Sequence, residues 1–269
     1  MTTHRPADVA AQYATEQHLR TRIETHRRYT VGPDLEDAVD ARLVLHGDEA
    51  LLDVGTGPGD FPGRLRAAGH RGRLVGADLS AGMVATAQAN HPGVEYVQAS
   101  ADALPFADQT FDVLTARHML YHVPDVPAAL SEFRRVLRPG GRFLAVTNPV
   151  GYMAELWEVL TEAAEAEPAL TGLRDSRGGF AAAFSEVNGA NWVRAAFGNV
   201  EVSFTDAALV FPTAELVLTY VESLMAWQRL EAPERERGHA VLRPLLEGRF
   251  RDGPWRVSKR MALLSAVRG

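Results

Sequence analysis

Apolar residues in the first half of the chain come in short runs that alternate with segments of helical periodicity. Five runs rich in valine, leucine and phenylalanine lie between about residues 50 and 148. They span residues 50–55, 73–79, 94–99, 111–116 and 141–148. Strands that alternate with helices in this way are typical of a parallel sheet with helices on both faces. The pattern therefore predicts a doubly wound α/β fold.

Two of the intervening helices have recognisable ends. After the first strand, Asp60 is expected to cap a helix whose first turn tolerates Pro62, and Gly69 is expected to end it in a left-handed conformation. After the second strand, Ser80 is expected to cap a helix over residues 81–90.

Three segments outside the alternating region bear on how a ligand would be covered. Residues 13–30 predict a polar helix with an apolar edge at Leu19 and Ile23, as in a solvated surface helix that packs on the core. The stretch from about 150 to 185 is too long for an ordinary turn and predicts a helical cap. Residues 215–230 predict one helix that is apolar on more than one face, so it covers either the core and a pocket or a subunit interface.

Composition narrows the class of protein. The chain has 269 residues, 46% of them hydrophobic, which is enough for one large domain with a cap. Cysteine is absent, the first residues contain no apolar signal segment, and no run reaches the roughly 18 apolar residues of a membrane span. We therefore expect a soluble, cytoplasmic protein without a membrane partner. The net charge is −6 and the basic residues are scattered, so nucleic acid is not expected as a partner.

The stretch "LLDVGTGPGDFPGRL", residues 51–65, carries three closely spaced glycines after the first strand. A plain turn needs one flexible residue, whereas Gly55, Gly57 and Gly59 together let backbone N–H groups approach a ligand. A dinucleotide site would use G-x-G-x-x-G, and this loop lacks the last glycine in either register. An ammonium group would tolerate the nearby Asp53. The loop therefore favours a ligand that carries an amino acid.

Two acidic residues follow the next strands. Asp78 lies about twenty residues after the glycines, where a carboxylate can accept hydrogen bonds from both hydroxyls of a ribose. A helix-capping or surface role is the alternative. Asp102, in "ASADALPF", could accept a hydrogen bond from an adenine amino group while Ala101 and Ala103 keep the slot narrow, or it is an ordinary loop residue.

Over about residues 48–148 these motifs resemble the class I S-adenosylmethionine-dependent methyltransferases, in particular the members of their small-molecule branch that are similar to methyltransferase domain 11 or 25. "LLDVGTGPG" is similar to the family's glycine motif, "VGADLS" to the acidic motif after it, "QASADALPFADQTFDVL" to its adenine-side motif, and "RVLRPGGRFLAV" to the turn into the fifth strand. The resemblance implies a Rossmann-like methyltransferase fold with a seven-stranded, mostly parallel sheet. Residues 199–211 and 255–267 would form its antiparallel edge.

The resemblance also implies a domain organisation and a set of cofactor contacts. Residues 1–46 would be an N-terminal helical lid, and residues 47–269 the methyltransferase domain with cap insertions at about 150–185 and 213–250. The cofactor would be S-adenosyl-L-methionine. Its methionine half would contact Gly55, Thr56, Gly57 and Gly59, its ammonium Asp53, its ribose Asp78, and its adenine Ala101, Asp102, Ala103, Leu79 and Met83. Met83 is equally well explained as a core residue.

The segment "ARHMLYHVPD", residues 116–125, falls where substrates lie in such enzymes. It is similar to the family's leucine-histidine-histidine-valine pattern, with Tyr121 at the first histidine position and His122 at the second. Arg117 would contribute backbone near the methionine moiety. His118 and His122 are four residues apart, so one helical turn would place them on the same face. They are structural residues, a general base or substrate-orienting pair, or, least favoured for want of a third ligand, a metal site, and we expect no metal.

These observations predict transfer of a methyl group from S-adenosylmethionine to a small organic acceptor, with S-adenosyl-L-homocysteine as the other product. Aromatic residues of the flanks, Tyr13, Tyr152 and Trp157, are candidates for lid or substrate contacts together with Tyr121. A nicotinamide-dependent oxidoreductase and a domain that binds the cofactor or a partner without catalysis remain as alternatives. The acceptor, the methylated atom and the oligomeric state, monomer or homodimer, are left open.

Overall fold

The computed structural model describes residues 16–269, apart from the side chains of residues 16, 17 and 177–180. Within this range the strands form one sheet in the order β1-β7-β8-β6-β5-β2-β3-β4. The strands are β1 (Thr30–Val31), β2 (Leu51–Val54), β3 (Leu74–Asp78), β4 (Glu95–Gln98), β5 (Phe111–Arg117), β6 (Leu137–Thr147), β7 (Glu201–Phe211) and β8 (Trp255–Val267).

The predicted mostly parallel sheet is confirmed. Strands β4, β3, β2, β5 and β6 are parallel and correspond to the five predicted runs, and β8 is antiparallel to both β6 and β7. The sheet differs from the expected seven strands by the two-residue strand β1, which pairs with β7. This strand could not be read from the sequence, because two residues carry no alternating pattern.

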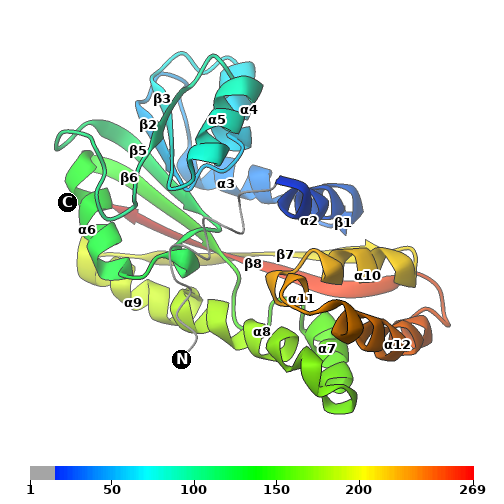
Figure 1. The fold of residues 1–269 in the computed structure, drawn as a ribbon. Helices are drawn as coiled ribbons and strands as arrows, with labels where there is room; N and C mark the ends of the chain where they lie inside the picture. The colour runs from blue at the N-terminus through cyan, green and yellow to red at the C-terminus, as the bar shows by residue number, and fades with distance from the viewer. Residues whose placement is uncertain (1–15) are drawn as a thin grey trace.

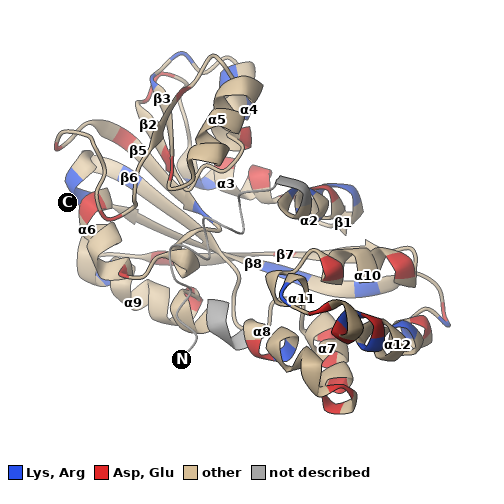
Figure 2. Ribbon diagram, in the orientation of Figure 1, with Lys and Arg blue, Asp and Glu red and all other residues tan. Residues whose placement is uncertain are grey.

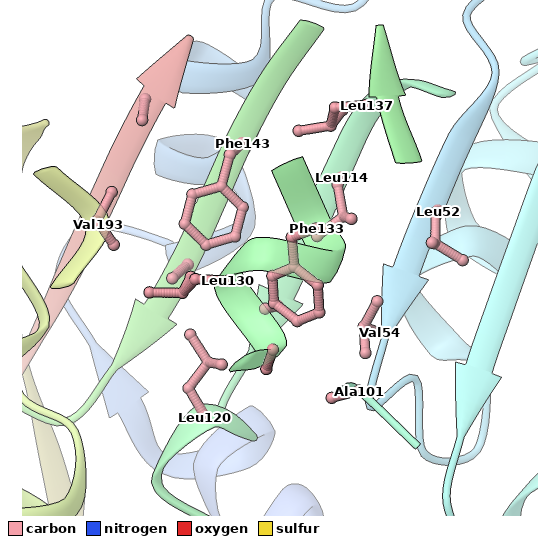
Figure 3. Packing of buried hydrophobic residues seen from close by; sticks show 14 of the residues in the cluster. Leu52, Val54, Ala101, Leu114, Leu120, Leu130, Phe133, Leu137, Phe143 and Val193 are labelled. Carbon is pink, nitrogen blue, oxygen red and sulfur yellow. The ribbon is translucent and has the colours of Figure 1, made fainter. Parts of the chain in front are cut away.

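Helices cover both faces of the sheet (Figure 1). The helices α3 (Leu35–Leu43), α4 (Asp60–Ala67) and α5 (Ala81–Asn90) pack on one face, while α6 (Val126–Val136) and α9 (Glu186–Phe197) pack on the other. The side chains of β2 alternate between these faces, with Leu51 in one core cluster and Leu52 and Val54 in the other. Figure 3 shows Phe133 of α6 and Phe143 of β6 in the cluster that contains Leu52.

The caps of two helices test the sequence prediction. Ser80 caps α5, since its hydroxyl accepts a hydrogen bond from the Met83 N–H at 3.3 Å, and Gly69 follows α4 in a left-handed conformation. The prediction for Asp60 was wrong. Gly59 is the N-cap of α4, with φ of 84°, and Asp60 is the first residue of the helix. The left-handed conformation of the cap excludes most side chains, so a glycine takes the place of a capping carboxylate.

A third core lies beyond the sheet proper. Strands β7 and β8 form the longest strand pairing in the sheet, and they continue past the carboxyl end of β6 (Figure 1). Their extension contacts the helices α7 (Ala154–Ala166), α10 (Ala214–Glu222), α11 (Met225–Gln228) and α12 (Ala232–Arg249), and Leu209, Phe211 and Val257 share a buried cluster with these helices. The short helix η2 (Pro168–Leu170) and the helix α8 (Thr171–Ala183) complete this half. The short helix η1 (Leu120–His122) follows β5, buries Leu120 in the sheet core and contacts α8. The chain therefore builds a second, largely helical layer over one end of the sheet.

The expectation of one helix over residues 215–230 was wrong, because the helix breaks between α10 and α11. Ser223 ends α10, and Leu224 is extended. The Ser223 hydroxyl donates to the Tyr220 carbonyl at 2.6 Å, and the Ser223 carbonyl accepts a hydrogen bond from Arg22. These bonds replace the main-chain bonds that would continue the helix. Arg22 belongs to α2 (Glu16–Tyr29), so the break also fixes α2 against α10.

Charged residues of the helical layer form ion pairs. Figure 2 shows Lys and Arg interspersed with Asp and Glu along α12. Arg243 pairs with Glu215 of α10 at 2.9 Å, and Arg249 pairs with Glu162 of α7 at 3.3 Å. Exposed pairs of this kind contribute little free energy each, so the buried cluster holds the layer together. None of the helices within residues 16–269 is long and apolar enough to cross a membrane.

Candidate active site

A cleft of about 1840 Å³ opens at the carboxyl ends of the parallel strands, between the sheet and the helical layer. One half is lined by the loops after β2, β3 and β4, and the other by residues of α2, α7, α8, α10, α11 and β8. The loop after β5 lines the cleft between these halves. Ligands of open α/β sheets bind at this end of the strands.

The glycine loop after β2 has the backbone that the sequence predicted. Gly55, Gly57 and Gly59 have φ values of 69°, 56° and 84°, and Gly55 and Gly57 line the cleft. A Cβ on Gly55 would lie 2.6 Å from the Met119 side chain, and a Cβ on Gly59 would lie 2.9 Å from Ala87. Neither position accepts a side chain without rearrangement, whereas Gly57 is open to the space around it. Thr56, which is buried, also lines the cleft.

Asp78 faces this loop from the end of β3. Its carboxylate accepts hydrogen bonds from the N–H groups of Gly57 and Ser80, each at 2.9 Å. Burial raises the pKa of Asp78, although these two hydrogen bonds oppose the shift. A carboxylate has about four lone-pair positions, so two remain for a ligand in the cleft.

Asp53 lies within β2, just before the glycine loop, and lines the cleft. It is 3% exposed, and its carboxylate accepts a hydrogen bond of 2.6 Å from the Thr115 hydroxyl, its partner in the β2–β5 register. Burial raises the pKa of Asp53, and the charge of Arg117 opposes that shift. Arg117 forms an ion pair with Glu36 and lies 4.4 Å from the centre of the Phe61 ring. Its guanidinium thus connects α3 to α4, the helix that follows the glycine loop, a role that the sequence did not indicate.

The residues predicted for the adenine side differ in their surroundings. Leu79 is 43% exposed although it is apolar, and Ala101 and Asp102 also line the cleft. Met83 reaches the cleft but is 1% exposed, so its burial agrees with the core alternative. Ala103 is not among the residues that line the cleft.

The expectation that one helical turn presents His118 and His122 on a common face was wrong. His118 follows the end of β5 in a left-handed conformation with φ of 56°, and His122 ends the short helix η1. Tyr121 and His122 contact each other edge to face, with ring centres 4.6 Å apart. Both histidines and Tyr121 line the cleft. Burial, followed by the charges of Arg117 and Lys259, lowers the pKa of His118 to about 3, so its imidazole is neutral at physiological pH.

A polar cluster in the helical half was not predicted. We define the His26 cluster as His26 of α2, Tyr152 before α7 and Tyr220 of α10. The His26 Nε2 atom lies 3.2 Å from the Tyr220 hydroxyl and 3.5 Å from the Tyr152 hydroxyl. Only Tyr152 was predicted. The other two belong to helices about 190 residues apart in sequence, and no local motif joins them.

Three of the remaining lid candidates line the cleft, and one lies outside the described residues. Trp157 lines the cleft, as do Leu19 and Ile23 of α2. Tyr13 lies outside the described residues. Among the residues that the structure describes there is no group of three or more His, Cys, Asp or Glu side chains placed to hold a metal ion.

Comparison with known proteins defines the class of the domain. Residues 52–145 match the family model described as a methyltransferase domain. This match covers the strands and loops that form the glycine loop, Asp78, Asp102 and Arg117. Together with the Rossmann-like fold, it confirms the prediction of a class I S-adenosylmethionine-dependent methyltransferase domain.

Among individual proteins, the chain is similar to the ubiquinone/menaquinone biosynthesis C-methyltransferase UbiE of Klebsiella pneumoniae subsp. pneumoniae. The two are 36% identical over 156 residues, which cover 54% of this chain and 58% of the relative. The chain thus spans about half the length of the curated relatives that it matches.

Two solved structures share the fold. The [4+2]-cyclase SpnF has a TM-score of 0.58 and 21% identity, covering 98% of this chain and 96% of that protein. Phosphoethanolamine N-methyltransferase 2 of Haemonchus contortus, in complex with phosphomonomethylethanolamine and S-adenosylhomocysteine, has a TM-score of 0.58 and 16% identity. The alignment covers 100% of this chain and 60% of that protein. At these identities the likeness concerns the fold alone.

Proposed function

We propose that the protein transfers a methyl group from S-adenosylmethionine to a small organic acceptor and releases S-adenosylhomocysteine. The single observation that carries the proposal is the position of Asp78. Its carboxylate is fixed by the N–H groups of Gly57 and Ser80 at the edge of the cleft, beside a loop with no side chains at Gly55 and Gly57. The methyltransferase domain match over the same segment supports it.

The residues of the sheet half fit the adenosyl amino acid. Asp78 would hold the ribose hydroxyls, the glycine loop the methionine moiety, and Asp53 the ammonium group. Leu79 offers an apolar surface to a base, and Asp102 offers an acceptor for its amino group. The buried carboxylates would be stabilised by a positively charged ligand, because burial raises the pKa of both Asp53 and Asp78.

The helical half would hold the acceptor. We infer that residues 1–46 form a lid and that the segments at about 150–185 and 213–250 form caps on the methyltransferase domain. Of these, Leu19, Ile23, Tyr152 and Trp157 line the cleft and would exclude water from it. A sulfonium methyl group is already activated when the cofactor is bound, so the protein has to align the reactants rather than supply a nucleophile.

His118 would orient the acceptor or take its proton. Its imidazole is neutral, because burial lowers its pKa to about 3, and it lines the cleft between the two halves. A neutral imidazole offers one nitrogen as a hydrogen-bond acceptor for a hydroxyl or amine. His122, which contacts Tyr121, would support this region from the neighbouring turn.

A test of catalysis has to measure methyl transfer itself, since a protein with this fold is described as a [4+2]-cyclase. The purified protein is incubated with S-adenosylmethionine labelled on the methyl group and with a panel of small aromatic and aliphatic acceptors. We expect labelled product and an equal amount of S-adenosylhomocysteine with at least one acceptor. Binding of the cofactor without turnover on any acceptor would favour the non-catalytic alternative. Binding of a nicotinamide cofactor instead would favour an oxidoreductase.

A further inference from the structure

The only lysine of the chain, Lys259, lines the helical half of the cleft. It belongs to β8, three residues before Ala262, which forms the last pair with β6. Lys259 therefore sits on the part of β8 that continues past the carboxyl end of β6, where the acceptor would lie. All other residues among the 28 Lys and Arg are arginines.

Lys259 is a partly buried cation with few polar partners. Its ammonium donates a hydrogen bond of 2.9 Å to the Thr30 hydroxyl. Within the described side chains no carboxylate forms an ion pair with it, although the charge of Asp34 acts on it. Burial lowers the pKa of Lys259, and Asp34 opposes that shift. A partly buried ammonium without a paired carboxylate is stabilised by an anion that enters its site.

The His26 cluster adds hydrogen-bond donors to the same region. Burial, followed by the charge of Lys259, lowers the pKa of His26 to about 3, so Lys259 lies near this cluster. Burial also raises the pKa of Tyr220 to about 12 and that of Tyr152 well above its usual value. Both phenols therefore stay protonated and can donate hydrogen bonds. The His26 Nδ1 atom is buried and has no hydrogen-bond partner among the described residues.

We propose that Lys259 and the His26 cluster bind an anionic oxygen of the methyl acceptor, so the acceptor is an organic acid, either a carboxylate or an ionised phenol or enol. This inference rests on the proposed function. A protonated amine would meet the positive charges of Lys259 and Arg22 and would be repelled. The apolar surfaces of Trp157, Met261 and Leu224 line the same cleft and suit the hydrocarbon part of such an acid.

The test compares anions with neutral molecules of the same shape. Benzoate and benzamide form one pair of probes, and 4-nitrophenol at a pH where it is ionised and 4-nitroanisole form the other. Each probe is titrated by calorimetry into the wild-type protein and into three variants, with and without saturating S-adenosylhomocysteine. The variants are Lys259→Met, which removes the charge, Lys259→Arg, which keeps it, and Arg260→Met. Arg260 is the adjacent residue, pairs with Asp206 at 3.1 Å and does not line the cleft, so it is the matched control.

We expect the wild-type protein to bind at least one anion about tenfold or more tightly than its neutral counterpart. Lys259→Met should lose this preference, while Lys259→Arg and Arg260→Met should keep most of it. A preference for benzoate would identify a carboxylate acceptor, and a preference for 4-nitrophenolate would identify an ionised hydroxyl. Thermal melting of each variant shows that it is folded.

Three results would overturn the inference. The first is equal anion binding by the wild-type protein and Lys259→Met, and the second is no anion preference in the wild-type protein although S-adenosylhomocysteine binds. The third is a loss of S-adenosylhomocysteine affinity in Lys259→Met, which would assign Lys259 to the cofactor's own carboxylate. If S-adenosylhomocysteine does not bind the wild-type protein, the proposed function is overturned instead. The titrations without S-adenosylhomocysteine then still test whether Lys259 binds anions.

Discussion

At the residue scale, the site uses burial to set the protonation of its side chains. His118 and His26 are neutral because they are desolvated beside cationic neighbours. Burial raises the pKa of Asp53, and the charge of Arg117 opposes that shift. On the surface, none of these groups would be desolvated in this way. Perturbed pKa values gathered in one cleft are typical of functional sites.

Replacing His118 tests its role at this scale. Asparagine tolerates the left-handed conformation that His118 adopts, with φ of 56°, so His118→Asn is preferable to alanine. If His118 orients or deprotonates the acceptor, we expect kcat to fall on the order of a hundredfold while S-adenosylhomocysteine affinity stays nearly unchanged. Steady-state kinetics and calorimetry measure the two quantities. An equal loss of both would make His118 a structural residue.

At the element scale, the turn from β2 into α4 combines a tightly packed glycine with an open one. Gly57 is open to its surroundings, whereas Gly59 lies against Tyr96 and Ala87. The same short loop therefore needs glycine for two different reasons. The sequence indicated the loop from the spacing of its glycines, but it could not separate these reasons, because Tyr96 and Ala87 come from β4 and α5.

Gly59→Ala and Gly47→Ala provide a matched comparison. Both glycines have a positive φ, 84° and 96°, but a Cβ on Gly47 meets nothing within 4 Å. We expect Gly47→Ala to lower the free energy of unfolding by about 1 kcal/mol through backbone strain. Gly59→Ala should cost about 1–3 kcal/mol more, because its Cβ would overpack the contact with Ala87. Urea denaturation measures both, and equal losses would contradict the packing argument.

The sheet was more predictable than the helical layer, for physical reasons. Most of the five parallel strands contain short, largely apolar runs bounded by turn residues, which is a local signal. The break between α10 and α11 depends on Arg22, about 200 residues away, which binds the Ser223 carbonyl. The His26 cluster likewise joins α2, α7 and α10 only in the folded chain. Motifs thus indicated the sheet half of the cleft, and long-range packing hid the helical half.

At the scale of the whole molecule, the cleft lies where the cores on the two faces of the sheet meet the core of the helical layer. The buried histidines at this junction make the folded protein less stable in acid. The pKa values of His26 and His118 are lowered to about 3 in the folded protein, below their usual value of 6.5. The unfolded chain therefore binds more protons between these limits, and stability falls as the pH drops through 6.5 toward 3.

This linkage predicts a measurable loss of stability in mild acid. Between pH 7 and pH 5.5 each of the two histidines should lower the free energy of unfolding by about 1 kcal/mol. Urea denaturation at the two pH values measures the sum, and the double variant His26→Asn, His118→Asn should show a correspondingly flatter dependence. The exposed His46 serves as the control position, replaced by asparagine. An identical pH dependence in the wild type and the double variant would contradict the assignment of neutral histidines.

The most direct measurement of the central claim is a calorimetric titration of S-adenosylhomocysteine into the wild-type protein, Asp78→Ala and Asp206→Ala. Asp206 is an exposed aspartate of β7 outside the cleft and is the matched control. We expect binding to the wild type and to Asp206→Ala. For Asp78→Ala we expect a loss of roughly 1–3 kcal/mol of binding free energy, because charge-assisted hydrogen bonds to the ribose disappear. Unchanged affinity in a folded Asp78→Ala variant, or no binding to the wild type, would contradict the claim.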